Sequence, residues 1–168
     1  MKHAIFVATL VIFAASCNTI TSSLPSVPAT PTVTATVNGS SWSTVGTLGA
    51  GSAFATRNAS SGVVTVTGIA TDQTEITLVL NSPKVGTSQF VLSGDVGEYS
   101  QGVPDTSTAY VTFPTLTNPL PGSVTITTFD TAKGSISGSF SFVARKTHNT
   151  ADTVRITNGV FSNITWSK

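Results

Sequence analysis

Three carboxylates fall in one irregular stretch of the chain and are the residues best placed to do chemistry. Asp95, Glu98 and Asp105 lie within residues 93–106, SGDVGEYSQGVPDT, which hold three of the seven acidic residues. A pair of carboxylates can act as acid and base in glycoside hydrolysis, and carboxylates together with backbone carbonyls bind Ca²⁺. Neither spacing matches a recognised motif. We interpret residues 93–106 as a loop whose acids bind Ca²⁺, act in hydrolysis or are simply solvated.

The aromatic residues and the histidine offer fewer options. Tyr99 lies in the same stretch and is the better candidate for an exposed aromatic platform that would bind a sugar or an apolar ligand. Trp42 alternates with Ser41 and Ser43, which favours a core position. His148 lies in a polar turn and is expected to be solvated. Because it is the one histidine after the N-terminal region, the sequence predicts no His-rich zinc site, and Ser/His/Asp or Cys/His catalysis has at most one candidate base. We expect no enzyme, no cofactor and no metal centre, with Ca²⁺ at the acids of 93–106 as the open alternative.

The single cysteine stands directly behind a short apolar run. Residues 4–13 form an apolar segment of about ten residues, the length of a signal-peptide core, and too short to span a membrane, which takes about 20. Small residues 14–16 follow, and then Cys17. This order resembles the lipobox of bacterial lipoproteins, in which the cysteine becomes the lipidated first residue. Ala14 replaces the usual leucine, and the alternative is ordinary secretory cleavage after Ser16.

Charge and flanking residues bear on the partners. Removal of residues 1–16 takes away Lys2 and leaves seven of the eight basic residues against seven acids. The basic residues are scattered singly, which excludes a nucleic-acid site built on phosphate contacts. Asn18 is not the aspartate that retains some lipoproteins at the inner membrane, and no acidic cluster follows Cys17. We expect a lipid anchor in the outer membrane, with the protein facing the periplasm.

The anchor is followed by a tether and then by the folded domain. Residues 18–31 read NTITSSLPSVPATP, with three prolines and no charge, a composition typical of a linker. If extended at about 3.1 Å per residue, this segment reaches roughly 40 Å. We expect a signal peptide over 1–16, the lipidated cysteine and tether over 17–31, and the domain over 32–168.

Beyond residue 32 the sequence alternates with a period of two between turn signals, which predicts antiparallel strands. Asn38-Gly39 between residues 32–37 and 40–43 predicts a hairpin. About nine or ten strands are expected. They cover residues 32–37, 40–43, 54–57, 63–69, 75–80, 89–92, 108–113, 123–129, 135–144 and 154–166, the last passing through Asn158-Gly159. Such a domain is all-β, either a β-sandwich or an up-and-down, calycin-like barrel, and its short turns favour a meander.

Hydroxyl residues recur at every second position in several of these segments. Threonine does so at 32, 34 and 36, at 65 and 67, and at 125 and 127, and serine at 135–141. Regular threonine arrays occur in ice-binding solenoids, but no fixed repeat is present here, and threonine suits a solvent-facing strand. With charged residues at 9%, such a surface allows contact with an envelope protein or a polysaccharide without electrostatic steering.

Two motifs carry a family resemblance. V-N-G-x-x-W occurs at residues 37–42, and I-S-G-x-F-x-F at 136–142 is followed by I-T-N-G-x-F at 156–161. The chain resembles small Bacteroidota lipoproteins that form a domain family of unknown function. The resemblance implies a β-rich envelope lipoprotein and supplies no catalytic residues.

We therefore expect a cell-envelope lipoprotein that acts as a non-catalytic binding or structural module of unknown ligand. One alternative is a calycin-like carrier with an interior pocket for a small apolar ligand. A second is a carbohydrate-active enzyme built on Asp95, Glu98 or Asp105.

Overall fold

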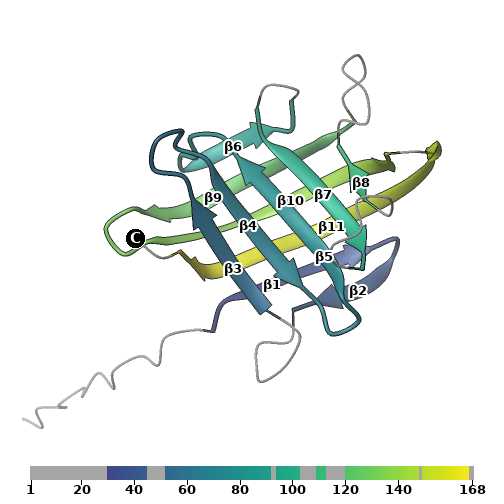
Figure 1. Ribbon diagram of the computed structural model, residues 1–168, viewed down its shortest axis with the longest axis horizontal. Helices are drawn as coiled ribbons and strands as arrows, with labels where there is room; N and C mark the ends of the chain where they lie inside the picture. Colours follow the sequence, from purple (N-terminus) through teal and green to yellow (C-terminus); the bar gives the residue numbers. More distant parts are fainter. Residues whose placement is uncertain are drawn as a thin grey trace, which may run out of the picture.

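Every regular element of the described chain is a β-strand. The computed structural model describes residues 30–44, 52–91, 94–102, 109–112, 120–147 and 149–166. Eleven strands join in one sheet (Figure 1). They are β1 (Thr32–Val37), β2 (Ser40–Ser43), β3 (Ser52–Arg57), β4 (Val64–Ile69), β5 (Thr74–Leu80), β6 (Gly86–Gln89), β7 (Val96–Gln101), β8 (Tyr110–Val111), β9 (Gly122–Asp130), β10 (Ser135–Lys146) and β11 (Asn149–Thr165). The all-β prediction is confirmed, and these ranges contain no helix able to cross a membrane.

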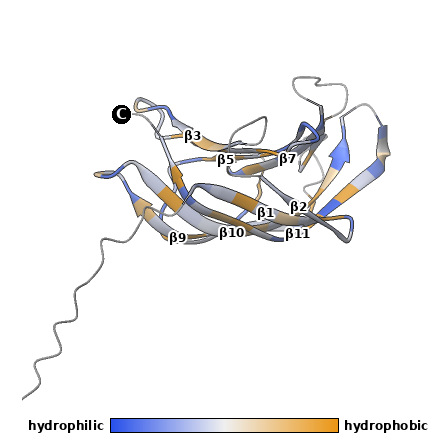
Figure 2. Cartoon of the chain, turned by 90° about the horizontal axis from the view of Figure 1, so that it is seen from below, coloured by the Kyte–Doolittle hydropathy of each residue, from blue (hydrophilic) through white to orange (hydrophobic). Residues whose placement is uncertain are grey.

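The sheet curls into a half-barrel with two facing layers. The first layer runs β6-β9-β10-β11-β1-β2, and the second runs β7-β5-β4-β3. Figure 2 shows β3, β5 and β7 lying over β1, β9, β10 and β11. Strand β8 joins the layers, because it pairs with β7 on one side and with Arg145 and Lys146 of β10 on the other. All neighbouring strands are antiparallel, and the core lies between the layers.

Two long strands carry the chain from one layer toward the other. β10 has 12 residues and β11 has 17. The pairing of β11 with β10 shifts register at three points, and two of them lie near Asn158 and Asn163, which have φ angles of 51° and 52°. Extra residues of this kind bend a strand and increase its twist. The Asn158-Gly159 pair therefore forms a bulge inside one continuous strand.

The connections are less simple than a meander. The hairpin predicted at Asn38-Gly39 is present, and both residues have positive φ, 48° and 87°. However, β1 pairs with the last strand, β11, and β5 pairs with β7 because β6 leaves the second layer to pair with β9. The predicted meander is wrong at these places, since alternation along a strand carries no information about its neighbour.

The first layer fills the interior with phenylalanine rings placed over glycines. Phe142 lies over Gly97, where a Cβ would come within 2.8 Å of its ring, and Phe140 lies over Gly159 at 2.5 Å. The Phe140 and Phe142 rings stack with centroids 6.1 Å apart. Phe161 is fully buried beside them, with its ring centroid 6.3 Å from that of Phe140. Aromatic side chains thus occupy the space that the glycines leave open.

The second layer contributes aliphatic side chains. Ile76, Leu78 and Leu80 alternate along β5 and are at most 1% exposed. A polar link also joins the layers at one edge: the Trp42 indole of β2 donates to the Thr74 hydroxyl of β5 at 2.7 Å. The predicted core position of Trp42 is confirmed.

Candidate functional site

The stretch that carries the predicted acids is largely a strand. Residues 96–101 form β7, between β5 and β8, so the prediction of a loop is wrong for them. Gly97 and Tyr99 face the interior, and Glu98 faces outward. The alternation of apolar and polar residues along β7 is hard to recognise in the sequence, because one inward position, under Phe142, is Gly97 and not an apolar side chain.

Tyr99 is buried rather than exposed. Its side chain is 6% exposed and packs against Tyr110, with ring centroids 6.0 Å apart. Burial raises the pKa of Tyr99 above its ordinary value. The predicted ligand platform is therefore wrong, because the ring forms part of the core between β7 and β8.

The structure does not bring the predicted acids together. Asp95 immediately precedes β7 and its side chain points inward, whereas the side chain of Glu98 points outward from β7. The two carboxylates therefore lie on opposite faces of the sheet. Asp105 lies outside the described residues, as do Cys17 and His148. Within the described ranges, no three acidic, histidine or cysteine side chains gather as metal ligands. Burial, and then the charge of Glu75, raises the pKa of Glu98.

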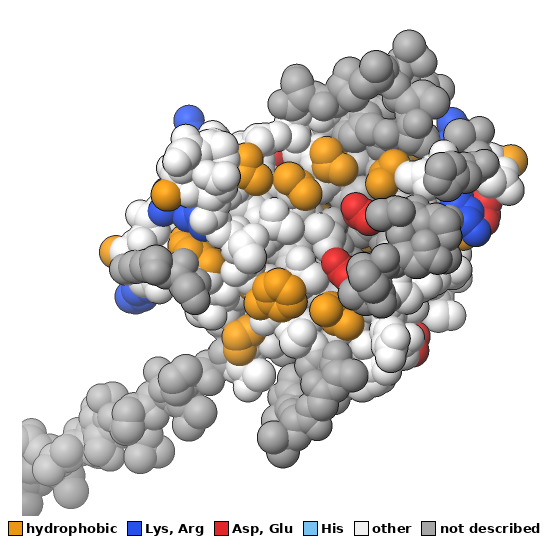
Figure 3. Space-filling model, viewed as in Figure 1, with side chains coloured by type: hydrophobic (Ala, Val, Ile, Leu, Met, Phe, Trp, Pro, Cys, Tyr) orange, Lys and Arg blue, Asp and Glu red, His pale blue; other side chains and the backbone are white. Residues whose placement is uncertain are grey.

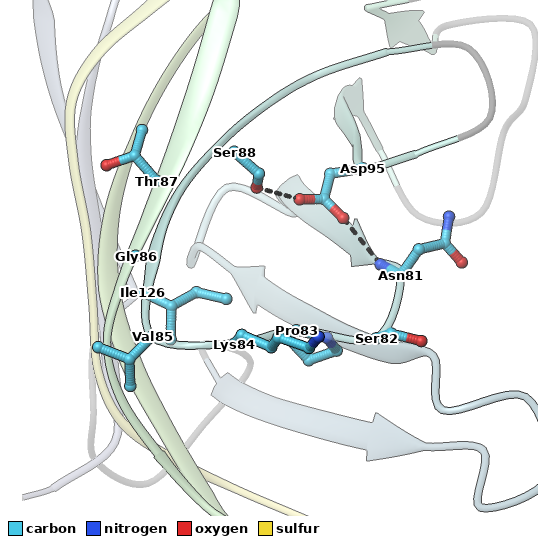
Figure 4. Close-up of a pocket in the computed structure, with 10 residues that line it drawn as sticks. All are labelled: Asn81, Ser82, Pro83, Lys84, Val85, Gly86, Thr87, Ser88, Asp95 and Ile126. Atoms are coloured by element: carbon cyan, nitrogen blue, oxygen red, sulfur yellow. Dashed lines mark hydrogen bonds between the residues drawn. The ribbon is translucent and has the colours of Figure 1, made fainter.

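A pocket lies where the half-barrel fails to close. Among the described strands, β6 pairs with β9, and the chain just after β6 is linked to the residue just before β7 by an isolated bridge between Phe90 and Asp95. We call the hollow beside this edge the seam pocket. It has a volume of about 300 Å³ and is lined by Asn81, Ser82, Pro83, Lys84, Val85, Gly86, Thr87, Ser88, Asp95 and Ile126 (Figure 4).

The Asp95 carboxylate fixes the walls of the seam pocket. It accepts hydrogen bonds from the backbone N–H of Asn81, at 2.8 Å, and from the hydroxyl of Ser88 (Figure 4). The Asn81 side chain in turn donates to the carbonyl of Gly94 at 2.6 Å. Asp95 is 7% exposed, so a charged group is held inside the protein at the mouth between the two layers.

A larger polar surface covers the outside of the first layer. Cross-strand pairing sets two rows of outward side chains over β6, β9, β10, β11, β1 and β2, and we call this surface the hydroxyl face. The first row is Thr87, Thr125, Ser139, Val160, Thr34 and Ser43, and the second is Gln89, Ser123, Ser141, Thr157, Thr36 and Ser41. Neighbours in a row lie about 4.8 Å apart. The two rows are two residues apart along each strand except β11, where the bulge at Asn158 leaves Thr157 and Val160 three residues apart.

The hydroxyl face is hollowed over β9, β10 and β11. Two cavities of about 200 and 460 Å³ share Ser123 and Ser141 and form one groove. Its described lining is hydroxyl, amide and apolar, with Arg155 as the single charged side chain and no acid. The Asn158 bulge opens the groove, since it displaces the outward residues of β11 from those of β10.

The sequence indicates the individual residues of the hydroxyl face but not their assembly into one surface. Serine occurs at every second position of 135–141 and threonine at 34, 36 and 125, a pattern that favours solvent-facing side chains. Their assembly in rows depends on pairing across the whole chain, for example of Thr34 with Val160. Thr65 and Thr67 follow the same pattern yet lie on β4 in the other layer.

The outer face of the second layer differs in character. Figure 3 shows this face, over β3, β4, β5 and β7, with hydrophobic groups spread among uncharged ones and acidic side chains near its centre. Phe54 is 42% exposed here. Glu75 accepts a hydrogen bond from Thr77 at 2.6 Å, and Glu98 lies next to Thr77 on the neighbouring strand.

One known protein family covers nearly the whole folded region of the chain. The model of a family described as "Domain of unknown function (DUF6252)" matches residues 29–165. The chain belongs to this family. DUF6252 thus spans the described strands from β1 to β11, which confirms the resemblance to a β-rich family of unknown function. Neither the search of curated proteins nor that of solved structures found a match.

Proposed function

We propose that this DUF6252 protein is a non-catalytic, membrane-anchored module that binds a polysaccharide across its hydroxyl face. The observation that carries the proposal is the pair of uncharged rows over six strands, with a groove between β9 and β11. Serine and threonine hydroxyls both donate and accept hydrogen bonds, as sugar hydroxyls do. A glycan can exchange its bound water for such partners without desolvating a buried charge.

Apolar groups within the groove support the same class of ligand. Val160 is 42% exposed in the first row, and Val143 lines the groove beside Ser141. Sugar rings present C–H faces as well as hydroxyls, and apolar side chains among polar ones provide contact for both. Arg155 at one end supplies a planar group of donors for oxygen ligands.

The lining of the groove favours binding over catalysis. Glycoside hydrolysis uses two carboxylates on either side of the bond that breaks. The described lining of the groove contains no aspartate or glutamate. Among the three cavities described, none is an apolar chamber inside the core, so the geometry gives less support to a carrier of an apolar ligand.

A binding assay with two matched variants tests the ligand class. We expect the full-length chain to sediment with insoluble polysaccharide, cell-wall glycan included. Ser139→Arg should abolish sedimentation by filling the groove, whereas Thr56→Arg adds the same charge on exposed β3 of the second layer and should not. Absence of binding to every polysaccharide, or equal effects of the two variants, would overturn the proposal.

The anchor is tested separately. We expect the mature chain from its host to begin at an acylated Cys17 and to remain with the outer membrane. Cys17→Ser should release it from the membrane fraction, since acyl chains supply the membrane affinity of such a protein. A mature chain that is soluble and carries a free thiol would instead support secretory cleavage after Ser16.

A further inference from the structure

The Asp95 carboxylate is buried without a cationic partner. It is 7% exposed and accepts its two described hydrogen bonds from neutral donors, the N–H of Asn81 and the hydroxyl of Ser88. In the described part of the chain, the ion pair found is Lys133 with Asp130, at 3.8 Å. No described lysine or arginine nitrogen lies within 4.0 Å of Asp95.

Such a carboxylate retains capacity for another donor. An ionised carboxylate has about four lone-pair positions, and two are used here. Removing a charge from water is costly unless hydrogen bonds or an opposite charge replace the solvent. A cationic ligand would complete the set and would be favoured over a neutral one of the same shape.

The rest of the seam pocket suits a slender ligand with an apolar stem. Pro83 is buried in its wall, and Val85 and Ile126 add aliphatic surface. The volume of about 300 Å³ is at the lower end of small-ligand sites. Figure 4 shows Asp95 on one side of the hollow, across from Ile126 and Val85.

We propose that the seam pocket binds a primary ammonium group on an aliphatic stem, with the nitrogen on the Asp95 carboxylate and the stem against Val85 and Ile126. A free diamine and a lysine side chain share this chemistry. The seam pocket shares only Thr87 of β6 with the described residues of the hydroxyl face, and the hydroxyl of Thr87 bonds Thr125 on that outer face, so the proposal does not depend on polysaccharide binding. Lys84 lines the same pocket from an exposed position, so its charge opposes the ligand.

Amide chemical shifts of the ¹⁵N-labelled full-length chain provide the test. The probes are 1,5-diaminopentane, Nα-acetyl-lysine amide and the uncharged Nα-acetyl-norleucine amide. Both amines should shift the amide of Asn81, which donates to Asp95, and the norleucine compound should not. A stronger response to the diamine identifies a free amine as the better ligand, and the reverse identifies a peptide lysine.

Two variants with opposite expected effects sharpen the test. Asp95→Asn keeps the shape and one acceptor oxygen and should weaken amine binding by at least about tenfold, the usual value of a hydrogen bond to a charged group. Lys84→Ala should strengthen it by about twofold, because a nearby like charge is removed.

The proposal is overturned by any of three results. These are an equal response to norleucine and lysine amides, unchanged affinity in Asp95→Asn, or weaker amine binding in Lys84→Ala, which is the opposite of what removal of a like charge from the pocket should do. If Asp95→Asn does not fold, the lysine and norleucine comparison on the native chain and the Lys84 variant still decide the question.

Discussion

The two layers place their side-chain volume differently. In the first layer, large rings point inward over glycines, as Phe140 does over Gly159, while serine and threonine point outward. In the second layer, branched aliphatic residues such as Leu78 point inward, and the outer face carries Phe54, Glu75 and Glu98. The contrast shows how one sheet can be tightly packed on both layers yet present a surface of mainly hydroxyl side chains on one of them only.

The largest loss of stability should follow the removal of side-chain volume from the inner face of the second layer. Leu78→Ala deletes a side chain that is 1% exposed in the centre of β5. We expect a loss of about 3 kcal/mol in the free energy of unfolding, because the surrounding strands cannot close the cavity. Chemical denaturation measures it. A loss below about 1 kcal/mol would mean that this layer is loosely packed and that the contrast fails.

The first layer should instead be sensitive to added volume. Gly159→Ala would place a Cβ 2.5 Å from the Phe140 ring, which is itself 4% exposed. We expect a loss of about 1–3 kcal/mol from overpacking. Ser139→Ala, on the outer side of the neighbouring strand, is the matched control and should change stability by less than about 0.5 kcal/mol. Equal losses in the two variants would contradict the separation of a tightly packed inner side from a polar outer side.

A smaller effect is expected where the layers are linked through Thr74. Asp72 accepts hydrogen bonds from the backbone N–H and the hydroxyl of Thr74, at 3.0 and 2.7 Å, and these bonds hold the pKa of Asp72 below its ordinary value. The stabilisation that the ionised Asp72 contributes is fully present above the pKa of this group in the unfolded state. It is lost as the pH falls through the pKa of Asp72 in the folded state. Asp72→Asn should lower Tm at pH 7 by about 2 °C. The difference should shrink as the pH approaches 3, and a constant difference in thermal scans would contradict the assignment.

The smallest effect, of opposite sign, concerns the acidic outer face. Burial, followed by the charge of Glu75, raises the pKa of Glu98. The folded state therefore binds a proton more readily than the unfolded state, and stability falls as the pH rises from the unfolded pKa through the folded one. Glu98→Gln should raise Tm at pH 7 by about 1 °C and have little effect below pH 4. A lower Tm at pH 7 would show that the ionised carboxylate is stabilised at this site.

The candidate sites were only partly predictable. The outward serines and threonines could be read from their alternation, because a strand exposes every second residue. The buried state of Tyr99 could not, since its strand contains Gly97 at an inward position that is filled by Phe142 of β10. The charge of Asp95 and its acidic neighbours make it a candidate site residue in the sequence. Its place in the seam pocket depends on hydrogen bonds from Ser88 of β6 and from Asn81, which follows β5.

The sequence by itself determined the all-β class, the hairpin at Asn38-Gly39, the inward faces of β5 and β10, and the family. These depend on local alternation, on turn residues and on motifs that lie within one or two strands. The tertiary structure decided that β1 joins β11, that β6 crosses to β9, and that outward hydroxyls from six strands form one face. Strand pairing is set by packing across distant parts of the chain, so a period of two along each strand leaves the neighbour open.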